Sequence, residues 1–269
     1  MLQTPDGFSL FTQNNLVENA KAHVLIVHGL GEHCLRYQHV AKALNAKGFN
    51  VFAFDLRGHG QSSGERGLIT NISEYLEDVK CVKANVPNHL PFFMIGHSMG
   101  GLITLQYLLD QSPFPLKGVV LTSAALEVGA DITPFKQFVI KLLAFISPKF
   151  KTVKLDPTSI SRDSNTVQNY INDPLIYHDA GKAGLGVALL SAIKNIKLRF
   201  SNLAYPVLLM HGTADTLTNP EGTKALYAQS VSQDKTLKLW EGAYHELFNE
   251  TNQTEVIDYM TAWINERVV

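Results

Sequence analysis

Cysteine is scarce in this sequence, neither sign of charge is in excess, and long apolar runs are missing. The two cysteines, Cys34 and Cys81, exclude a disulfide framework and a zinc site built on cysteine spacing, and they fit a reducing compartment. The formal net charge of −1 gives no overall basic field, which argues against a nucleic-acid partner. No apolar run approaches the roughly 20 residues that cross a bilayer, so we expect no membrane-spanning helix.

What is present is an ordinary globular composition. Of the 269 residues, 45% are hydrophobic and 17% are charged, which is enough to bury a large core as one domain or as one domain with an insertion. The first residues, MLQTPDGFSLFTQNN, lack the basic segment followed by an apolar segment that a signal peptide needs. We therefore expect a cytoplasmic protein.

Short apolar runs that end in glycine or in a polar turn predict β-strands. They are nearly continuous rather than alternating, as expected for strands buried on both faces of a parallel sheet. Helical patterns lie between them, and this alternation predicts an α/β fold with a doubly wound, mostly parallel sheet. The predicted strands are 23–29, 50–55, 91–96, 118–123, 205–212 and 236–242, and the predicted helices are 36–48, 72–86, 101–111 and 254–268. Residues 7–15 are expected to supply an antiparallel strand at the edge of the sheet.

The alternation stops between about Leu126 and Asn202, a stretch too long for a connecting loop. It carries helical patterns of its own at 133–146 and 184–196. We interpret residues 126–202 as a helical cap, or lid, inserted into a core formed by residues 1–125 and 203–269.

The stretch GHSMGG, residues 96–101, matches G-x-S-x-G between a predicted strand and a predicted helix. That context is the one in which a sharp turn exposes a nucleophilic serine, here Ser98. Small flanking residues let the strand and the helix approach, and the helix N-terminus adds positive potential beneath the serine. The alternative is a glycine-rich turn with an incidental serine, and the strand–turn–helix context favours the nucleophile.

A serine hydroxyl needs a base, and the base needs an acid that orients it. Asp215 follows the predicted strand 205–212, and His245 follows the predicted strand 236–242. Ser98, Asp215 and His245 thus stand in the chain order Ser–Asp–His at the carboxyl ends of parallel strands, where open sheets bind ligands. Taken singly, Asp215 could cap a turn, with Asp234 as a nearby alternative acid, and His245 could be any one of ten histidines.

Acyl transfer also needs donors for the oxyanion. Met99, the residue after the nucleophile, supplies one backbone N–H, and Leu30 in the loop HGLGEH (28–33) is the natural second donor. The alternative for this loop is a flexible turn, in which His28 and His33 are structural. No metal or organic cofactor is implied.

The helix expected at 133–146 carries more apolar surface than one core-facing side needs. Phe138 and Leu142 belong to a stripe with helical spacing, and Ile140 and Phe145 lie off it. Either the stripe packs in the core of the cap, or the helix is a hydrophobic lid that touches lipid aggregates or lines an acyl pocket.

Together these segments resemble the monoacylglycerol lipases of the α/β-hydrolase superfamily. The resemblance rests on HGLGEH (28–33), FDLRGHGQSSGERG (54–67), GHSMGG (96–101), HGTADTLTNPEG (211–222) and SQDKTLKLWEGAYHELFNE (232–250), with 173–196 similar to that family's lid. It implies an α/β-hydrolase fold, a Ser98–Asp215–His245 triad, and Leu30 and Met99 as oxyanion donors. It also implies that Arg36 helps to place the glycerol head group, with Asp131 or Glu127 as an acidic partner.

The sequence departs from the family at Phe248, where some members have a second histidine near the glycerol pocket, and at Thr218, where some have a cysteine. The resemblance implies a serine carboxylester hydrolase that acts on monoacylglycerols or similar single-chain lipid esters. Its lid would contact membranes or micelles transiently. The alternatives are a lysophospholipase, a general esterase or thioesterase, an aminopeptidase with the same triad, and a non-catalytic lipid carrier.

Overall fold

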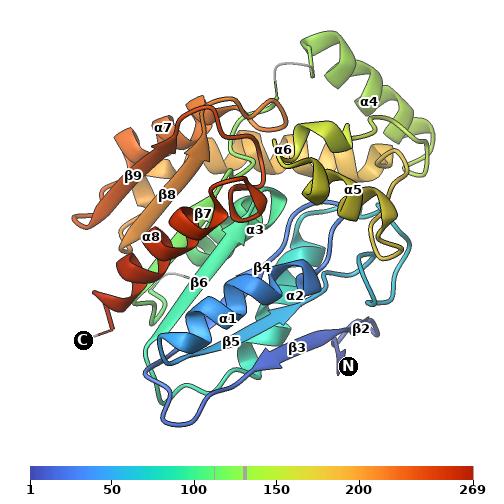
Figure 1. Ribbon diagram of the computed structural model, residues 1–269. Coiled ribbons are helices and arrows are strands. Elements are labelled where there is room, and N and C mark those ends of the chain that lie inside the picture. Colours follow the sequence, from blue (N-terminus) through green and yellow to red (C-terminus); the bar gives the residue numbers. More distant parts are fainter. Residues whose placement is uncertain (112, 130–131, 269) are drawn as a thin grey trace.

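The protein is described by a computed structural model that covers residues 1–111, 113–129 and 132–268 (Figure 1). Within these residues, seven strands form one sheet in the order β3-β5-β4-β6-β7-β8-β9. β3 pairs antiparallel with β5, and the other pairings are parallel. The strands are β3 Thr12–Asn15, β4 Ala22–Val27, β5 Phe49–Phe54, β6 Phe92–His97, β7 Gly118–Thr122, β8 Val207–Gly212 and β9 Lys235–Trp240, and β1 Leu2–Gln3 and β2 Ser9–Leu10 form a separate antiparallel pair.

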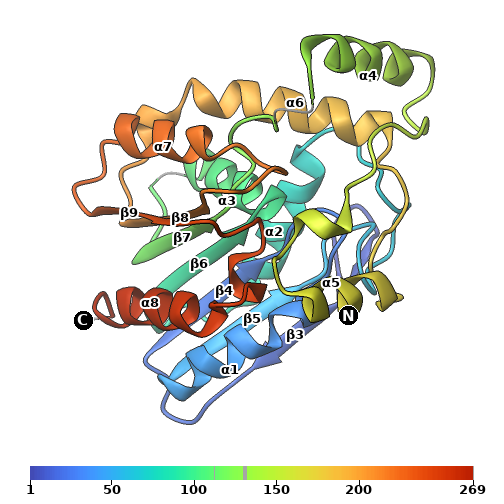
Figure 2. The ribbon, with the colours of Figure 1, turned by 45° about the horizontal axis from the view of Figure 1, so that its top comes forward.

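Helices cover both faces of this sheet (Figure 2). The α-helices are α1 Gln38–Ala46, α2 Ser73–Ala84, α3 Met99–Asp110, α4 Pro134–Ile146, α5 Ser164–Asn172, α6 Ala183–Lys197, α7 Pro220–Gln229 and α8 Gln253–Asn265. The 3₁₀ turns are η1 Cys34–Tyr37, η2 Pro157–Ser159, η3 Phe200–Asn202 and η4 Leu247–Asn249. One apolar cluster joins α1 and α8 to one face of the sheet, and another joins α2, α3, α6 and α7 to the opposite face. Strands covered in this way need apolar side chains on both faces, which explains their continuous hydrophobic runs.

The predicted strands and the antiparallel edge strand are confirmed. So are the helices expected at 36–48, 72–86, 101–111 and 254–268, with shifts at their ends. Two helices were not predicted, α5 and α7. In both, an N-cap side chain accepts from the first turn: Asp163 from the N–H of Asn165, and Asn219 from that of Glu221.

The segment between β7 and β8 carries α4, α5 and α6, which lie near the carboxyl ends of the parallel strands (Figures 1 and 2). α6 packs on α3, and α4 packs on α6, so α4 is the outermost layer. Most of its apolar residues face outward, and the Phe145 side chain is 90% exposed.

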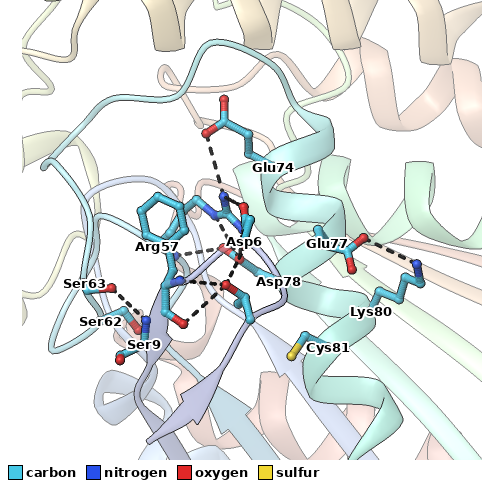
Figure 3. Close-up of polar contacts among 12 residues, drawn as sticks. Asp6, Ser9, Arg57, Ser62, Ser63, Glu74, Glu77, Asp78, Lys80 and Cys81 are labelled. Atoms are coloured by element: carbon cyan, nitrogen blue, oxygen red, sulfur yellow. Dashed lines mark hydrogen bonds and ion pairs between the residues drawn. The ribbon is translucent and has the colours of Figure 1, made fainter.

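The loop after β5 is tied to the rest of the core by ion pairs of the buried Arg57 (Figure 3). Nη2 of Arg57 lies 2.7 Å from Oδ1 of Asp78 in α2, and Nη1 lies 2.6 Å from Oδ2 of Asp6 in the N-terminal segment. Asp55 at the start of this loop accepts the N–H of Cys34 at 2.7 Å and that of Gln61 at 2.8 Å. The loop is therefore a brace between the N-terminal segment, α2 and the turn that follows β4.

Candidate active site

Ser98 stands between β6 and α3 in a backbone conformation that L-residues rarely adopt, with φ 53° and ψ −121°. Its N–H donates to the carbonyl of Thr122 at 3.0 Å, and its carbonyl accepts from Gly101 and from Ala125, each at 3.0 Å. These bonds hold the strained turn from both sides and keep the serine at the N-terminus of α3.

The glycines on either side of Ser98 are required by close approach. A Cβ on Gly96 would lie 2.6 Å from Oγ1 of Thr104 and 2.7 Å from the carbonyl oxygen of Gly100. A Cβ on Gly100 would collide with the carbonyl oxygens of Val27 and His28. The helix can therefore pass directly over β4 and β6 because both positions lack side chains.

The structure brings Asp215 and His245 together, as the sequence predicted. Nδ1 of His245 lies 2.7 Å from Oδ2 of Asp215. Oδ1 of Asp215 accepts the backbone N–H groups of Leu217 at 2.8 Å and Thr218 at 3.0 Å. Asp215 follows β8 and His245 follows β9, while Ser98 follows β6, so all three residues lie at the carboxyl ends of parallel strands.

The charges of this pair are strongly coupled. Burial opposes ionisation of Asp215, but the attraction of His245 and the hydrogen bonds of His211 and His245 outweigh it and hold its pKa far below the usual range. Burial likewise opposes protonation of His245, but the negative charge of Asp215, aided by Glu246 and Glu32, raises the pKa of His245. The pair thus favours an imidazolium beside a carboxylate.

Three buried polar residues around the pair were not identified from the sequence. His97 lies with its ring centroid 4.8 Å from that of His245, and burial together with the charge of His245 lowers the pKa of His97 to about 4. Glu32 accepts the N–H of Gly29 at 2.6 Å; burial raises its pKa, but Arg36 outweighs this and brings the pKa to about 2. His211 is fully buried, and its Nε2 lies 3.1 Å from Oδ2 of Asp215. All three lie within the motifs HGLGEH, GHSMGG and HGTADTLTNPEG, but a motif does not say which way each side chain points.

Ser98 and His245 open onto a cavity of about 200 Å³. Leu30 and Met99 line it on the core side, and Met99 is the first residue of α3, so its N–H has no partner inside the helix. The segment between β7 and β8 supplies most of the remaining wall, which is largely apolar: Ile132, Ile140, Val153, Leu155, Leu185, Leu189, Leu190 and Ile193. The cavity is therefore an apolar chamber with the serine and histidine at its base.

The structure corrects two expected contacts with a polar head group. Arg36 is engaged by two buried carboxylates: Nη1 lies 2.9 Å from Glu32, and Nη1 and Nη2 each lie 2.6 Å from Glu246. Phe248 is 2% exposed and packs edge-on to Tyr37 in the apolar core rather than on the cavity wall. Arg36 therefore braces the site from outside the cavity.

The structure also corrects the expected lining of the acyl pocket. Phe138 and Leu142 are 61% and 48% exposed on the outer side of α4, and Ile140, which lies off the predicted stripe, faces the cavity. The reason is that α4 meets α6 through the Ile140 side, where a Cβ on Gly186 would lie 2.9 Å from Cγ2 of Ile140. Glu127 does line the cavity and pairs with Lys197, whereas Asp131 lies outside the described residues.

The chain is similar to proteins of known function over most of its length. A family model described as serine aminopeptidase, S33, matches residues 18–252, so the chain belongs to that family. Monoglyceride lipase of Rattus norvegicus is 35% identical over 255 residues, which cover 92% of this chain and 84% of the relative. Monoacylglycerol lipase of Mycolicibacterium smegmatis is 36% identical over 244 residues, which cover 90% of this chain and 87% of the relative. The chain is a member of the monoglyceride lipase family.

Solved structures of monoglyceride lipases have the same architecture. The crystal structure of Paleococcus ferrophilus monoacylglycerol lipase has a TM-score of 0.88 at 32% identity and covers 96% of this chain and 99% of its own. A soluble variant of Saccharomyces cerevisiae monoglyceride lipase, in complex with a substrate analog, has a TM-score of 0.87 at 26% identity and covers 100% of this chain and 95% of its own. The expected α/β-hydrolase fold and the expected family are thereby confirmed.

The described residues contain neither a metal-binding cluster nor a membrane-spanning helix. Among them, no group of three or more His, Cys, Asp and Glu side chains is arranged to hold a metal ion. None of the helices in the described part of the chain is long and apolar enough to cross a membrane.

Proposed function

We propose that this protein is a serine hydrolase that cleaves monoacylglycerols to fatty acid and glycerol. The observation that carries the proposal is the 2.7 Å His245–Asp215 pair at the base of an apolar cavity that also contains Ser98 in a strained turn. The long apolar wall suits a single acyl chain, and the family membership supports an ester of glycerol.

In this mechanism, Oγ of Ser98 attacks the ester carbonyl carbon while Nε2 of His245 takes its proton. Asp215 accepts the Nδ1–H of His245 and stabilises the imidazolium. The N–H groups of Leu30 and Met99 donate to the oxyanion, and the N-terminus of α3 adds positive potential. His245 then returns the proton to the glycerol oxygen, and the acyl-enzyme on Ser98 is hydrolysed by water that His245 activates.

The test is hydrolysis of a monoacylglycerol by the purified chain and by Ser98→Ala. We expect the wild-type chain to release fatty acid and to be labelled by a fluorophosphonate, and the variant to do neither, with an unchanged circular dichroism spectrum. The same assay measures turnover of lysophosphatidylcholine, short esters and aminoacyl amides, which shows the preferred head group. Activity retained by Ser98→Ala would contradict the assignment of Ser98 as the nucleophile. Faster turnover of another substrate would change the assigned substrate and leave the assigned nucleophile in place.

We also propose that the outer face of α4 contacts a lipid surface during substrate uptake. This face carries the exposed side chains Phe135, Phe138, Leu142, Phe145 and Ile146. Ile140, on the opposite side of α4, forms part of the cavity wall. One helix would therefore separate the lipid surface from the cavity.

A further inference from the structure

We infer that His211 is a positioning residue that orients Asp215 toward His245, and that Thr223 holds His211 in the form that does so. The inference rests on the proposed function, because it assigns a role to a residue behind the proposed triad. It concerns a second histidine on the same carboxylate, at the end of β8, that does not reach the cavity wall formed by Ser98 and His245.

His211 bridges a helix and the proposed catalytic acid. Its Nδ1 lies 2.7 Å from Oγ1 of Thr223 in the first turns of α7, and its Nε2 lies 3.1 Å from Oδ2 of Asp215. His211 and the Asp215 side chain are fully buried, and Thr223 is almost fully buried. A buried polar group without a hydrogen-bond partner destabilises the fold. We therefore treat each of these contacts as a hydrogen bond with one donor and one acceptor.

The protons follow from the chemistry of the partners. An ionised Asp215 only accepts hydrogen bonds, so Nε2 of His211 must carry the hydrogen that points to it. When His211 is neutral, its other nitrogen is an acceptor, and Nδ1 then receives the hydroxyl hydrogen of Thr223. The threonine thereby selects one tautomer of His211, and that tautomer presents an N–H to the acid.

That N–H fixes the direction of the carboxylate. Oδ1 of Asp215 is held by the two backbone N–H groups after it, and Oδ2 is shared by His245 and His211, with the hydroxyl of Thr218 at 2.8 Å. The hydroxyl of Thr218 also lies 3.0 Å from the carbonyl of Ser123, so its proton has another acceptor. Nε2 of His211 lies 3.1 Å from Oδ2 of Asp215 and 3.3 Å from Oγ1 of Thr218, and of these two oxygens that of Asp215 is the nearer and the charged one. His211 thus acts together with Thr218 to hold Oδ2 toward His245.

The experiment compares His211→Leu with His211→Gln, and Thr223→Val with Thr223→Ser. Glutamine keeps an N–H donor at the reach of Nε2, and serine keeps the hydroxyl, whereas leucine and valine keep volume and lose the polar group. The readouts are the rate at which a fluorophosphonate labels Ser98, kcat and KM for the monoacylglycerol, and the pH dependence of kcat/KM. Urea unfolding of each variant shows that the chains compared are folded.

We expect His211→Leu to lower kcat and the labelling rate by about 10- to 100-fold with KM changed less than about twofold, as the loss of one hydrogen bond to a charged group predicts. Without the N–H of His211, Oδ2 of Asp215 is no longer held toward His245, so Asp215 raises the pKa of His245 less and the acid limb of kcat/KM moves to lower pH. Thr223→Val should lower kcat by a smaller factor, and His211→Gln and Thr223→Ser should recover most of the lost activity.

Two results would overturn the inference. One is an unchanged labelling rate and pH profile in both His211→Leu and Thr223→Val. The other is an equal loss in His211→Leu and His211→Gln, which would mean that the shape of the ring matters rather than its N–H. A wild-type chain that the fluorophosphonate does not label would overturn the proposed triad itself. A labelled wild-type chain that does not cleave monoacylglycerol would overturn the substrate alone, with the labelling rates still deciding the role of His211.

Discussion

Ser98 carries backbone strain that its own side chain causes. A non-glycine residue at φ 53° and ψ −121° is destabilised by about 1–3 kcal/mol, whereas glycine adopts this conformation freely. Glycine also makes the unfolded chain more flexible, which costs about 0.4–1 kcal/mol. We therefore expect Ser98→Gly to unfold at higher urea than Ser98→Ala, with a gain of up to about 2 kcal/mol. Equal midpoints for the two inactive variants would show that the turn is not strained.

The pH dependence of the reaction follows from the raised pKa of His245. The base must be neutral to accept a proton, so kcat/KM should fall as the pH drops through a pKa above the usual 6.5 of histidine. In Asp215→Asn the negative charge is gone, so that pKa should fall and the acid limb should move to lower pH. The variant should also lose about 10⁴-fold in kcat, because asparagine does not favour the productive tautomer. An acid limb that stays in place would show that Asp215 does not set the pKa.

The same pair contributes to stability in opposite pH ranges. His245, with its pKa raised on folding, stabilises the fold below the unfolded value near 6.5, and this contribution is lost as the pH rises through the folded value. Asp215, with its pKa lowered on folding, stabilises the fold above its unfolded value near 3.8, and this is lost as the pH falls below it.

At the residue scale, motif and chain order predicted the elements that bring Ser98, Asp215 and His245 together, because a strand end fixes where a backbone position lies. They did not predict which way neighbouring side chains turn. The sequence places Arg36 near the site, but its guanidinium pairs with Glu246, 210 positions later, and Arg36 does not line the cavity. Such pairings depend on tertiary packing and leave no local signal.

At the scale of elements, the outer face of α4 leads to a prediction about lipid binding. Phe145→Glu places a charge on this face, which should reduce sedimentation of the chain with phospholipid vesicles and slow hydrolysis of vesicle-bound monoacylglycerol. Hydrolysis of a short water-soluble ester should stay unchanged, because Phe145 is on the side of α4 away from the cavity. The matched control is Leu16→Glu, an exposed apolar residue in the loop after β3. An equal loss of vesicle binding in both variants would contradict a specific contact through α4.

Helix prediction failed where the local signal was weak. α5, with the sequence SNTVQNYIN, has few apolar residues, and α7 begins with Pro-Glu-Gly, which reads as a turn. Asp163 and the Asn219–Pro220 pair were available as start signals. The apolar stripe of α4 was recognised, but periodicity cannot say which side of a helix finds a partner. Contact with α6 decided that Ile140 turned inward.

At the scale of the whole molecule, Arg57 links segments that are distant in the chain (Figure 3). Asp78→Ala would leave a buried guanidinium without its main partner, so we expect a loss of about 3–5 kcal/mol in the free energy of unfolding by urea. Asp6→Ala removes the half-exposed partner of the same guanidinium and should cost about 1 kcal/mol or less. Equal stability of the two variants would show that the buried Arg57–Asp78 pair does not hold α2 to the loop after β5.

The overall architecture was the most predictable level. Continuous apolar strands alternating with helices specify a parallel sheet covered on both faces, whatever the contacts of individual residues. The strand order and the packing of the cap depend on contacts far apart in the sequence. The proposed limits of the cap, 126–202, follow from where the alternation stops, and remain an interpretation of this fold.

The three residues of the proposed triad follow β6, β8 and β9, and the segment that carries α4, α5 and α6 lies between the first and the other two. During synthesis the nucleophile therefore leaves the ribosome more than a hundred residues before its acid, and the base follows later still. Closing so long a stretch of chain is slow compared with forming local helices. The return of activity during refolding therefore reports when Ser98, Asp215 and His245 come together. We expect it to lag behind the return of helical circular dichroism.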